Sequence, residues 1–260
     1  MSIYDDNFIL IYTLILAFIL GSVFGSFLNC MADRISNHEK WWTGRSKCDA
    51  CGHTLSILDL FPVFSYIFLK GKCRYCGSKL SIRYVISEVL LGVLFVIILV
   101  VHGTIDFELF NELGLVCVLY GLSLCDLKTY EIPDGFILFG IIWWIIFNIL
   151  EESSIGYYIG SLISAVVISG SVLLISLLMD KVLKKESMGG GDIKLLFLVG
   201  LYLGLAQSLF NLILSCIFGL LLIVVLKKEK IPFGPAISFA TYISLLYGVQ
   251  FLGWYMSLLV

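Results

Sequence analysis

Charged residues are scarce in this chain compared with a soluble protein. Its 260 residues include 17 Lys and Arg and 19 Asp and Glu, so that 14% are charged while 60% are hydrophobic. Soluble globular domains carry about 25% charged residues, and the mean hydropathy here is +1.02. The composition therefore excludes a soluble globular domain and indicates an integral membrane protein.

The sequence also lacks two features, a signal-peptide start and a nucleotide-binding loop. The amino-terminal segment has no basic residue before its first apolar run and carries Asp5 and Asp6 instead. A cleavable signal peptide has a basic start and a shorter apolar run, so we expect this segment to be a membrane helix of the protein. No glycine-rich nucleotide-binding loop follows a predicted strand. The sequence thus gives no local signature of a nucleotide-containing cofactor.

The apolar segments predict an all-α polytopic membrane protein with about eight transmembrane helices, since about 20 mostly apolar residues cross a bilayer. The apolar stretch over residues 193–226 is too long for one crossing at about 1.5 Å per residue. We divide it around Gly204 to Asn211, with a re-entrant hairpin as the alternative. The predicted helices are 8–31, 84–102, 111–125, 135–150, 155–179, 193–207, 208–226 and 235–259.

Small residues at helical spacing predict close helix packing in two of these segments. The first helix contains Gly21, Gly25 and Ser26, and the fifth contains Gly156, Gly160, Ser164, Ser169 and Gly170. Ordinary packing is the main interpretation for both sets.

Basic residues occur in only some of the connections between helices. With eight crossings, all of these connections fall on one side, which the positive-inside rule makes cytoplasmic. Both termini are then expected outside the cytoplasm. The basic residues are Arg34, Lys40, Arg45, Lys47, Lys70, Lys72, Arg74, Lys79, Arg83, Lys128, Lys181, Lys184, Lys185, Lys194, Lys227, Lys228 and Lys230.

Four cysteines in the first cytoplasmic connection form two C-x-x-C knuckles separated by 21 residues. Each knuckle aims two sulfurs at one point and is followed by a glycine, so Cys48, Cys51, Cys73 and Cys76 predict a structural zinc site. A loop of this size builds little core alone, and a metal would stabilise it. Redox-active or metal-free cysteines are the alternative. The apolar stretch 55–69 between the knuckles is expected to pack on the cluster or to lie on the membrane surface.

Two aspartates lie at the ends of predicted helices. Asp126 ends the third helix and Asp192 opens the sixth, so the predicted topology brings both to the cytoplasmic face at similar depth. A carboxylate beside hydrocarbon is costly unless a partner or a function retains it. Two carboxylates held close share one proton, which is the arrangement that activates a water for attack on a peptide bond. Solvated interfacial charges are the alternative.

Neighbouring residues support this hypothesis. Gly189 to Gly191 precede Asp192, where they would permit positive φ or a close backbone approach to a substrate. Lys194 either biases the ionisation of Asp192 or anchors its helix at the interface. Asp134 lies just ahead of an apolar run, where it is expected to cap a helix.

Several segments together resemble the bacterial type IV prepilin leader peptidases. The resemblance covers essentially the whole chain. Near the amino terminus it rests on residues 22–34. In the first cytoplasmic connection and the helix that follows, it rests on the paired knuckles, the segments 61–66, 71–73 and 81–84, and Glu88. Around the two aspartates it rests on Asp126 with residues 132–134 and on the run 189–194. The chain departs from the family pattern at Val85, where relatives tend to have proline, and at Trp41 and Trp42, which replace a proline-rich entry to the first knuckle.

The resemblance implies a location in the bacterial inner membrane and a function for the chain. Asp126 and Asp192 would be the catalytic dyad of a G-x-G-D aspartyl protease that removes the short basic leader from prepilins or pseudopilins. Members with the cysteine loop also methylate the new amino terminus with S-adenosylmethionine, and Glu88 is the methyl-transfer candidate.

This interpretation predicts a division of the chain into three parts and a set of binding partners. We expect a first membrane helix (1–31), a zinc-binding loop domain (32–83) and a membrane-embedded peptidase domain (84–260). Pilin substrates and membrane lipids are the expected partners, and nucleic acid is not one. The alternatives are a proton- or ion-coupled transporter that uses the two aspartates, and a zinc-stapled membrane scaffold without catalysis.

Overall fold

A computed structural model describes residues 3–4, 6–41, 44–48, 50–184, 188–227 and 231–259. Trp42 and the predicted cytoplasmic residues Lys185, Lys228 and Lys230 lie outside these ranges, as does Asp5. Over these residues the protein is helical, which confirms the predicted all-α class, and its only extended pairings are two isolated bridges. The elements are α1 (Asn7–Ser36), η1 (Ile57–Leu60), α2 (Phe64–Phe68), α3 (Ile82–His102), α4 (Phe107–Thr129), α5 (Asp134–Leu150), α6 (Ile155–Leu183), α7 (Gly190–Leu226) and α8 (Gly234–Leu259).

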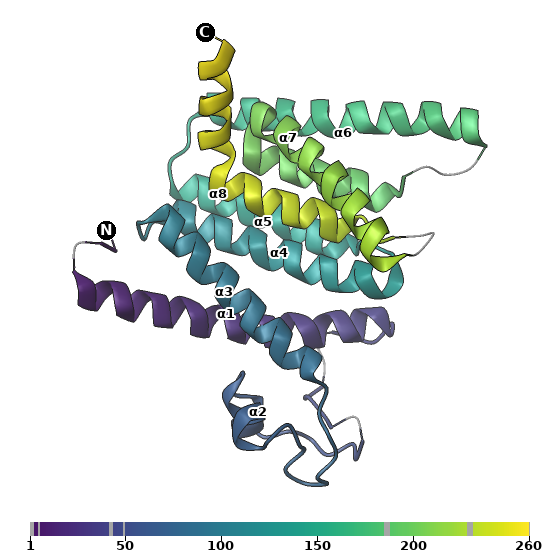
Figure 1. Cartoon of the computed structure of the whole chain (residues 1–260). Helices are drawn as coiled ribbons and strands as arrows, with labels where there is room; N and C mark the ends of the chain where they lie inside the picture. The colour runs from purple at the N-terminus through teal and green to yellow at the C-terminus, as the bar shows by residue number, and fades with distance from the viewer. Residues whose placement is uncertain are drawn as a thin grey trace. The chain divides into compact units, whose positions relative to one another are not determined.

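The chain forms two compact units, Met1–Leu109 and Phe110–Val260 (Figure 1). In the first unit α1 packs along α3. A Cβ added at Gly21 would lie 2.7 Å from the carbonyl oxygen of Leu91, and one at Gly25 would lie 3.0 Å from Cα of Glu88. These glycines therefore permit the close backbone approach that their spacing predicts.

In the second unit α7 packs on both α6 and α8. The glycines of α6 do not make this contact, because a Cβ at Gly160 or Gly170 would meet no atom within 4 Å. The close approach comes from the other helix: a Cβ at Gly200 would lie 2.6 Å from Cα of Ala165. Ser164 and Ser169 of the same predicted set are buried, whereas the three glycines are exposed. The prediction of close packing was therefore wrong for the glycines, because small residues permit a close approach only where a partner helix faces them.

The long helix α7 is broken at Gly204, whose φ of 69° and ψ of 177° are not helical. A straight helix of 37 residues would be about 55 Å long. The start of α7 lies near the end of α4, because Gly191 packs against Ile132, and the start of α8 lies there too, because Gly234 bonds to Asp126. Figure 1 shows that α7 turns back on itself. Gly204 lies within the region where the sequence predicted the division.

Six of the described helices are long and apolar enough to span a membrane, namely α1, α3, α4, α6, α7 and α8. The seventh apolar helix, α5, has 17 residues and is shorter than a typical span. The predicted eight segments thus correspond to seven helices, one of which is divided at Gly204.

Candidate active site and cysteine cluster

Asp126 lies in the last turns of α4, where its side chain is 4% exposed. Its Oδ2 accepts a hydrogen bond of 2.8 Å from the backbone N–H of Gly234 at the start of α8. A Cβ at Gly234 would lie 2.7 Å from the same oxygen, so no other residue fits there without displacing the carboxylate. Sequence reasoning missed Gly234. The signal was its position between Pro232 and Pro235, directly before an apolar helix.

Asp192 is the third residue of α7 and is half-buried. Its N–H donates to the carbonyl of Gly189 at 3.1 Å. The Asp126 and Asp192 carboxylates lie within electrostatic range of one another. Two aspartates 66 positions apart in the chain are therefore brought to one end of the second unit by α4 and α7.

One glycine of the run before Asp192 permits close packing. None of Gly189, Gly190 and Gly191 has a positive φ, so the expectation of a left-handed backbone there is not met. A Cβ at Gly191 would lie 2.9 Å from Cβ of Ile132, in the connection that follows α4. The absence of a side chain at Gly191 lets the start of α7 approach the end of α4.

Lys194 pairs with Asp134 through a contact of 2.6 Å between Nζ and Oδ1. The two side chains are 54% and 73% exposed. Asp134 is the first residue of α5, where Pro133 is the cap position and no side-chain cap bond forms. The expected capping role of Asp134 was therefore wrong, because its carboxylate is turned toward Lys194 on α7.

The four predicted zinc ligands form one cluster in the loop between α1 and α3. The sulfurs of Cys48, Cys51, Cys73 and Cys76 all lie within 4.8 Å of one another, and those of Cys48 and Cys76 are 3.9 Å apart. Tetrahedral zinc with bonds of about 2.3 Å separates its sulfurs by about 3.8 Å. The cluster therefore fits a zinc ion.

The two knuckles have the same local structure. In the first, the Cys48 N–H donates to the carbonyl of His53 at 2.9 Å, and the Gly52 N–H donates to the carbonyl of Cys48 at 2.8 Å. Cys73 makes the matching bonds with Ser78 and Gly77 at 2.8 and 3.0 Å. Both glycines have positive φ, 68° and 71°, which glycine adopts without strain.

The thiols resist ionising together. Backbone N–H groups of Cys51 and Ala50, with the Ser78 hydroxyl, lower the pKa of Cys48 to about 6. Although the N–H of His53 acts in the lowering direction, desolvation and the neighbouring Cys76 and Cys48 thiols raise the pKa of Cys51 to about 11. The negative charge of the first thiolate opposes ionisation of the remaining cysteine thiols. A zinc dication bound among the four sulfurs would neutralise that charge.

Glu88 lies on α3 at its contact with α1, with 7% of its surface exposed. Its carboxylate accepts a 2.8 Å bond from the N–H of Val63 and a bond from the Ser26 side chain. Val63 has a φ of 62°, which is strained for a β-branched residue. The bond to Glu88 helps to hold that strained turn against α3.

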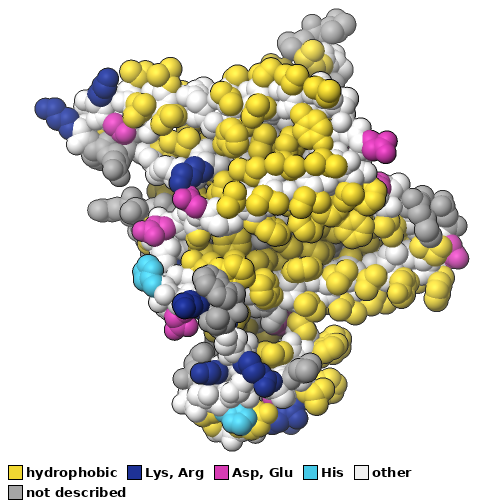
Figure 2. Space-filling view, turned by 180° about the vertical axis from the view of Figure 1, so that it is seen from behind, with side chains coloured by type: hydrophobic (Ala, Val, Ile, Leu, Met, Phe, Trp, Pro, Cys, Tyr) yellow, Lys and Arg dark blue, Asp and Glu magenta, His cyan; other side chains and the backbone are white. Residues whose placement is uncertain are grey.

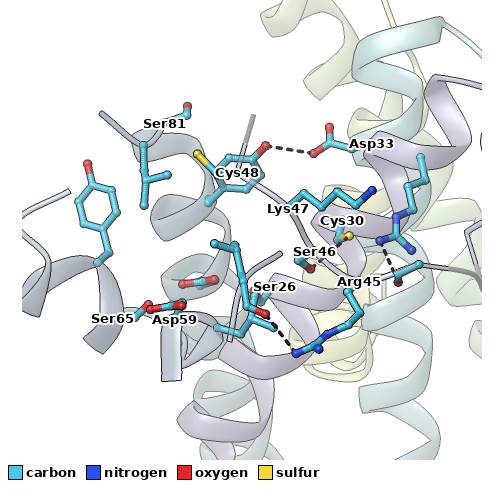
Figure 3. Close-up of a pocket in the computed structure, with 18 of the residues that line it drawn as sticks. Ser26, Cys30, Asp33, Arg45, Ser46, Lys47, Cys48, Asp59, Ser65 and Ser81 are labelled. Carbon is cyan, nitrogen blue, oxygen red and sulfur yellow. Dashed lines mark hydrogen bonds between the residues drawn. The ribbon is translucent and has the colours of Figure 1, made fainter. Parts of the chain in front are cut away.

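Glu88 borders a cavity of about 590 Å³ in the first unit. Figure 3 shows polar side chains from α1 and the cysteine loop around it, with Asp33, Arg45 and Lys47 among them. The Tyr84 hydroxyl lies 3.4 Å from Oδ2 of Asp33. A volume of this size, lined by groups of both charges, is suited to a dipolar small molecule.

These features define a multi-pass membrane protein with a helix-end aspartate pair and a four-cysteine cluster. Residues 19–102 match the Bacterial Peptidase A24 N-terminal domain, and residues 113–224 match the Type IV leader peptidase family. The chain belongs to the prepilin leader peptidase/N-methyltransferase family. The family resemblance of the sequence is thereby confirmed.

Three relatives, each named a prepilin leader peptidase/N-methyltransferase, show the extent of the match. The protein from Bacillus subtilis (strain 168) is 28% identical over 248 residues, which cover 93% of this chain and 97% of the relative. The Pseudomonas putida protein is 30% identical over 95% of both chains. The Aeromonas salmonicida (strain A449) protein is 34% identical over 82% of this chain and 75% of its own. No solved structure matches the chain.

Proposed function

We propose that this protein is an inner-membrane aspartic endopeptidase that removes the leader from prepilins or pseudopilins. Asp126 and Asp192 are the catalytic pair. The observation that carries the proposal is the junction of α4, α7 and α8. There the Gly234 N–H binds the buried Asp126 carboxylate, and the Asp192 carboxylate lies within electrostatic range of it. Membership of a leader peptidase family supplies the class of reaction.

The chemistry follows from two carboxylates that share one proton. The ionised carboxylate takes a proton from a water, and the water oxygen attacks the carbonyl carbon of the scissile peptide. The protonated carboxylic acid donates a hydrogen bond to the carbonyl oxygen as negative charge develops there. The tetrahedral intermediate then breaks its C–N bond, and the leaving nitrogen receives a proton.

The partition of basic residues supports a cytoplasmic site and extracytoplasmic termini. A prepilin leader is basic and remains on the cytoplasmic side, where the start of α7 and the end of α4 would meet it. The transporter alternative has no support from the three relatives described above, each of which is named a leader peptidase.

We further propose that the first unit carries the N-methyltransferase activity for which its relatives are named. S-adenosylmethionine would supply an electrophilic methyl group. Glu88 would bind the new amino terminus and take the proton that the amine loses as it becomes methylated. The depth of Glu88 beside the cavity supports this role. Zinc held by the four cysteines would keep the loop that covers this cavity in place.

The protease proposal is tested by incubating the purified protein in detergent with a prepilin and following loss of the leader. Asp126→Asn and Asp192→Asn should each reduce cleavage by more than about a thousandfold, because neither variant retains a shared-proton carboxylate pair. Asp134→Asn is the matched control, since it removes an exposed carboxylate at the start of a neighbouring helix. Cleavage by either dyad variant at the rate of the Asp134 control would overturn the assignment.

A further inference from the structure

The loop between α1 and α3 carries an exposed apolar surface that neither proposed activity uses. It consists of five side chains from η1, α2 and the turn between them, which we call the α2 patch. Figure 2 shows apolar side chains gathered on this part of the loop. The members and their exposed fractions are Leu58 (70%), Phe61 (53%), Phe64 (48%), Ile67 (63%) and Phe68 (81%). Five large apolar side chains together in water would be unfavourable.

The α2 patch lies beside the part of α1 that is predicted to be in the membrane. An apolar groove of about 200 Å³ is lined by Phe18, Ile19 and Val23 of α1 together with Phe61 and Phe64. The exposed face of α1 is therefore continuous with the patch.

The contact between the loop and α3 indicates how deep the patch lies in the membrane. Val63 donates to Glu88, and Glu88 packs opposite Gly25 of α1. Residue 25 lies six positions before the predicted cytoplasmic end of the first span at residue 31, which is about 9 Å along a helix. Amphipathic elements at membrane surfaces bury their apolar faces by about 5–10 Å. The groove extends the contact further along α1, because Val23 and Phe18 lie eight and 13 positions before residue 31, or about 12 and 20 Å. The patch therefore reaches from interfacial depth into the acyl-chain region.

Charge around the patch fits the same environment. Lys70 and Lys72 directly follow α2, and both are exposed. The side of the membrane to which the basic loops are assigned presents anionic lipid headgroups, which attract lysines placed near them.

We propose that the α2 patch inserts into the cytoplasmic leaflet of the bilayer and contacts lipid directly. Phe61, Phe64 and Phe68 contact acyl chains, and Lys70 and Lys72 contact anionic headgroups. The cysteine-clustered loop is then held on the membrane at two points, its covalent connection to α1 and α3 and this inserted surface. The inference does not depend on either proposed enzymatic activity.

The test places a photoreactive p-benzoylphenylalanine at position 68 of the full chain and, as the matched control, at position 75. Tyr75 is an exposed aromatic residue of the same loop, but its ring packs on His53 at the second knuckle, with centroids 3.7 Å apart. Both variants are reconstituted in vesicles of phosphatidylethanolamine and phosphatidylglycerol, irradiated, and analysed for lipid adducts by mass spectrometry.

Position 68 should give at least about fivefold more lipid adduct than position 75, because only the inserted surface reaches acyl chains. Equal yields, or crosslinks from position 68 mainly to residues 110–260 or to a second copy of the chain, would overturn the proposal. Zinc content, measured for both variants, verifies that the loop is folded. Replacing phosphatidylglycerol by phosphatidylcholine should reduce the adduct at position 68. An unchanged yield would remove Lys70 and Lys72 from the interaction.

Discussion

The cysteine cluster and the aspartate pair are positioned in opposite ways. Each knuckle is built within six residues, by backbone bonds such as Cys48 to His53, and a metal can join the two knuckles. The aspartate pair is assembled from three helices, and the bond from Gly234 to Asp126 spans 108 positions of the chain. A local site of this kind is lost as a unit with its metal. A site built from distant helices is sensitive to small shifts in packing.

The largest expected effect is on the local site. The double variant Cys48→Ser, Cys51→Ser should reduce zinc from about one per chain to nearly none, because structural zinc contributes about 10–16 kcal/mol to the folding of small domains. The loop should become protease-sensitive and methylation should be lost. Metal analysis and limited proteolysis measure these changes, with Cys216→Ser, a cysteine outside the cluster, as the control. Unchanged zinc content would refute the four-sulfur site.

The next effect separates the two activities. Glu88→Gln should reduce methylation of the processed pilin by about a hundredfold or more, as expected for loss of a catalytic proton acceptor. Leader cleavage should remain within about twofold, since the dyad belongs to the other unit. Mass spectrometry of the pilin amino terminus reports both products. Glu39→Gln alters an exposed carboxylate of the same cavity and should leave methylation unchanged. Equal loss of both activities in the Glu88 variant would argue for a purely structural role.

A smaller effect probes the long-range assembly. Gly234→Ala should lower cleavage by roughly ten- to a hundredfold, because a displacement of about 1 Å at a catalytic group has effects of this size. Gly253→Ala is the matched control on the same helix, since its added methyl group would meet no atom within 4 Å. Zinc content should be normal in both variants. If the two variants cleave equally well, Asp126 does not need the space that Gly234 leaves.

The smallest effect concerns the pair of Lys194 and Asp134. Exposed ion pairs contribute about 0–1 kcal/mol, so Lys194→Met should lower the cleavage rate by less than about fivefold. The double variant with Asp134→Asn should be no worse than either single variant. A double-mutant cycle on cleavage rates measures this coupling. A loss comparable to that of Asp192→Asn would instead place Lys194 in the catalytic machinery.

Features encoded in short stretches could be predicted from the sequence. The apolar runs indicated the helices, and the C-x-x-C-G spacing indicated turns that place Cys48 with Cys51 and Cys73 with Cys76. The break in α7 could also be placed approximately, because no single crossing accommodates so long a run. Each of these predictions depends on backbone geometry that repeats within a few residues.

Features that depend on which helix faces which could not be predicted. The glycines of α6 looked suited to close packing, yet Gly200 of α7 makes the close contact. Asp134 had the position of a helix cap, yet it pairs with Lys194, which lies 60 positions away. Local propensity did not anticipate these partners, because they are chosen by the packing of whole helices.

The sequence by itself determined that this is a helical membrane protein with two helix-end aspartates and four clustered cysteines. Hydropathy, charge partition and turn spacing can be determined from the sequence alone, because each depends on the order of residues along the chain. Only the tertiary structure decided that Gly234 holds Asp126, that Gly191 admits α7 to the end of α4, and that Val63 joins the loop to Glu88. These contacts arise from close packing between segments far apart in the chain, where a single Cβ determines whether two backbones can meet.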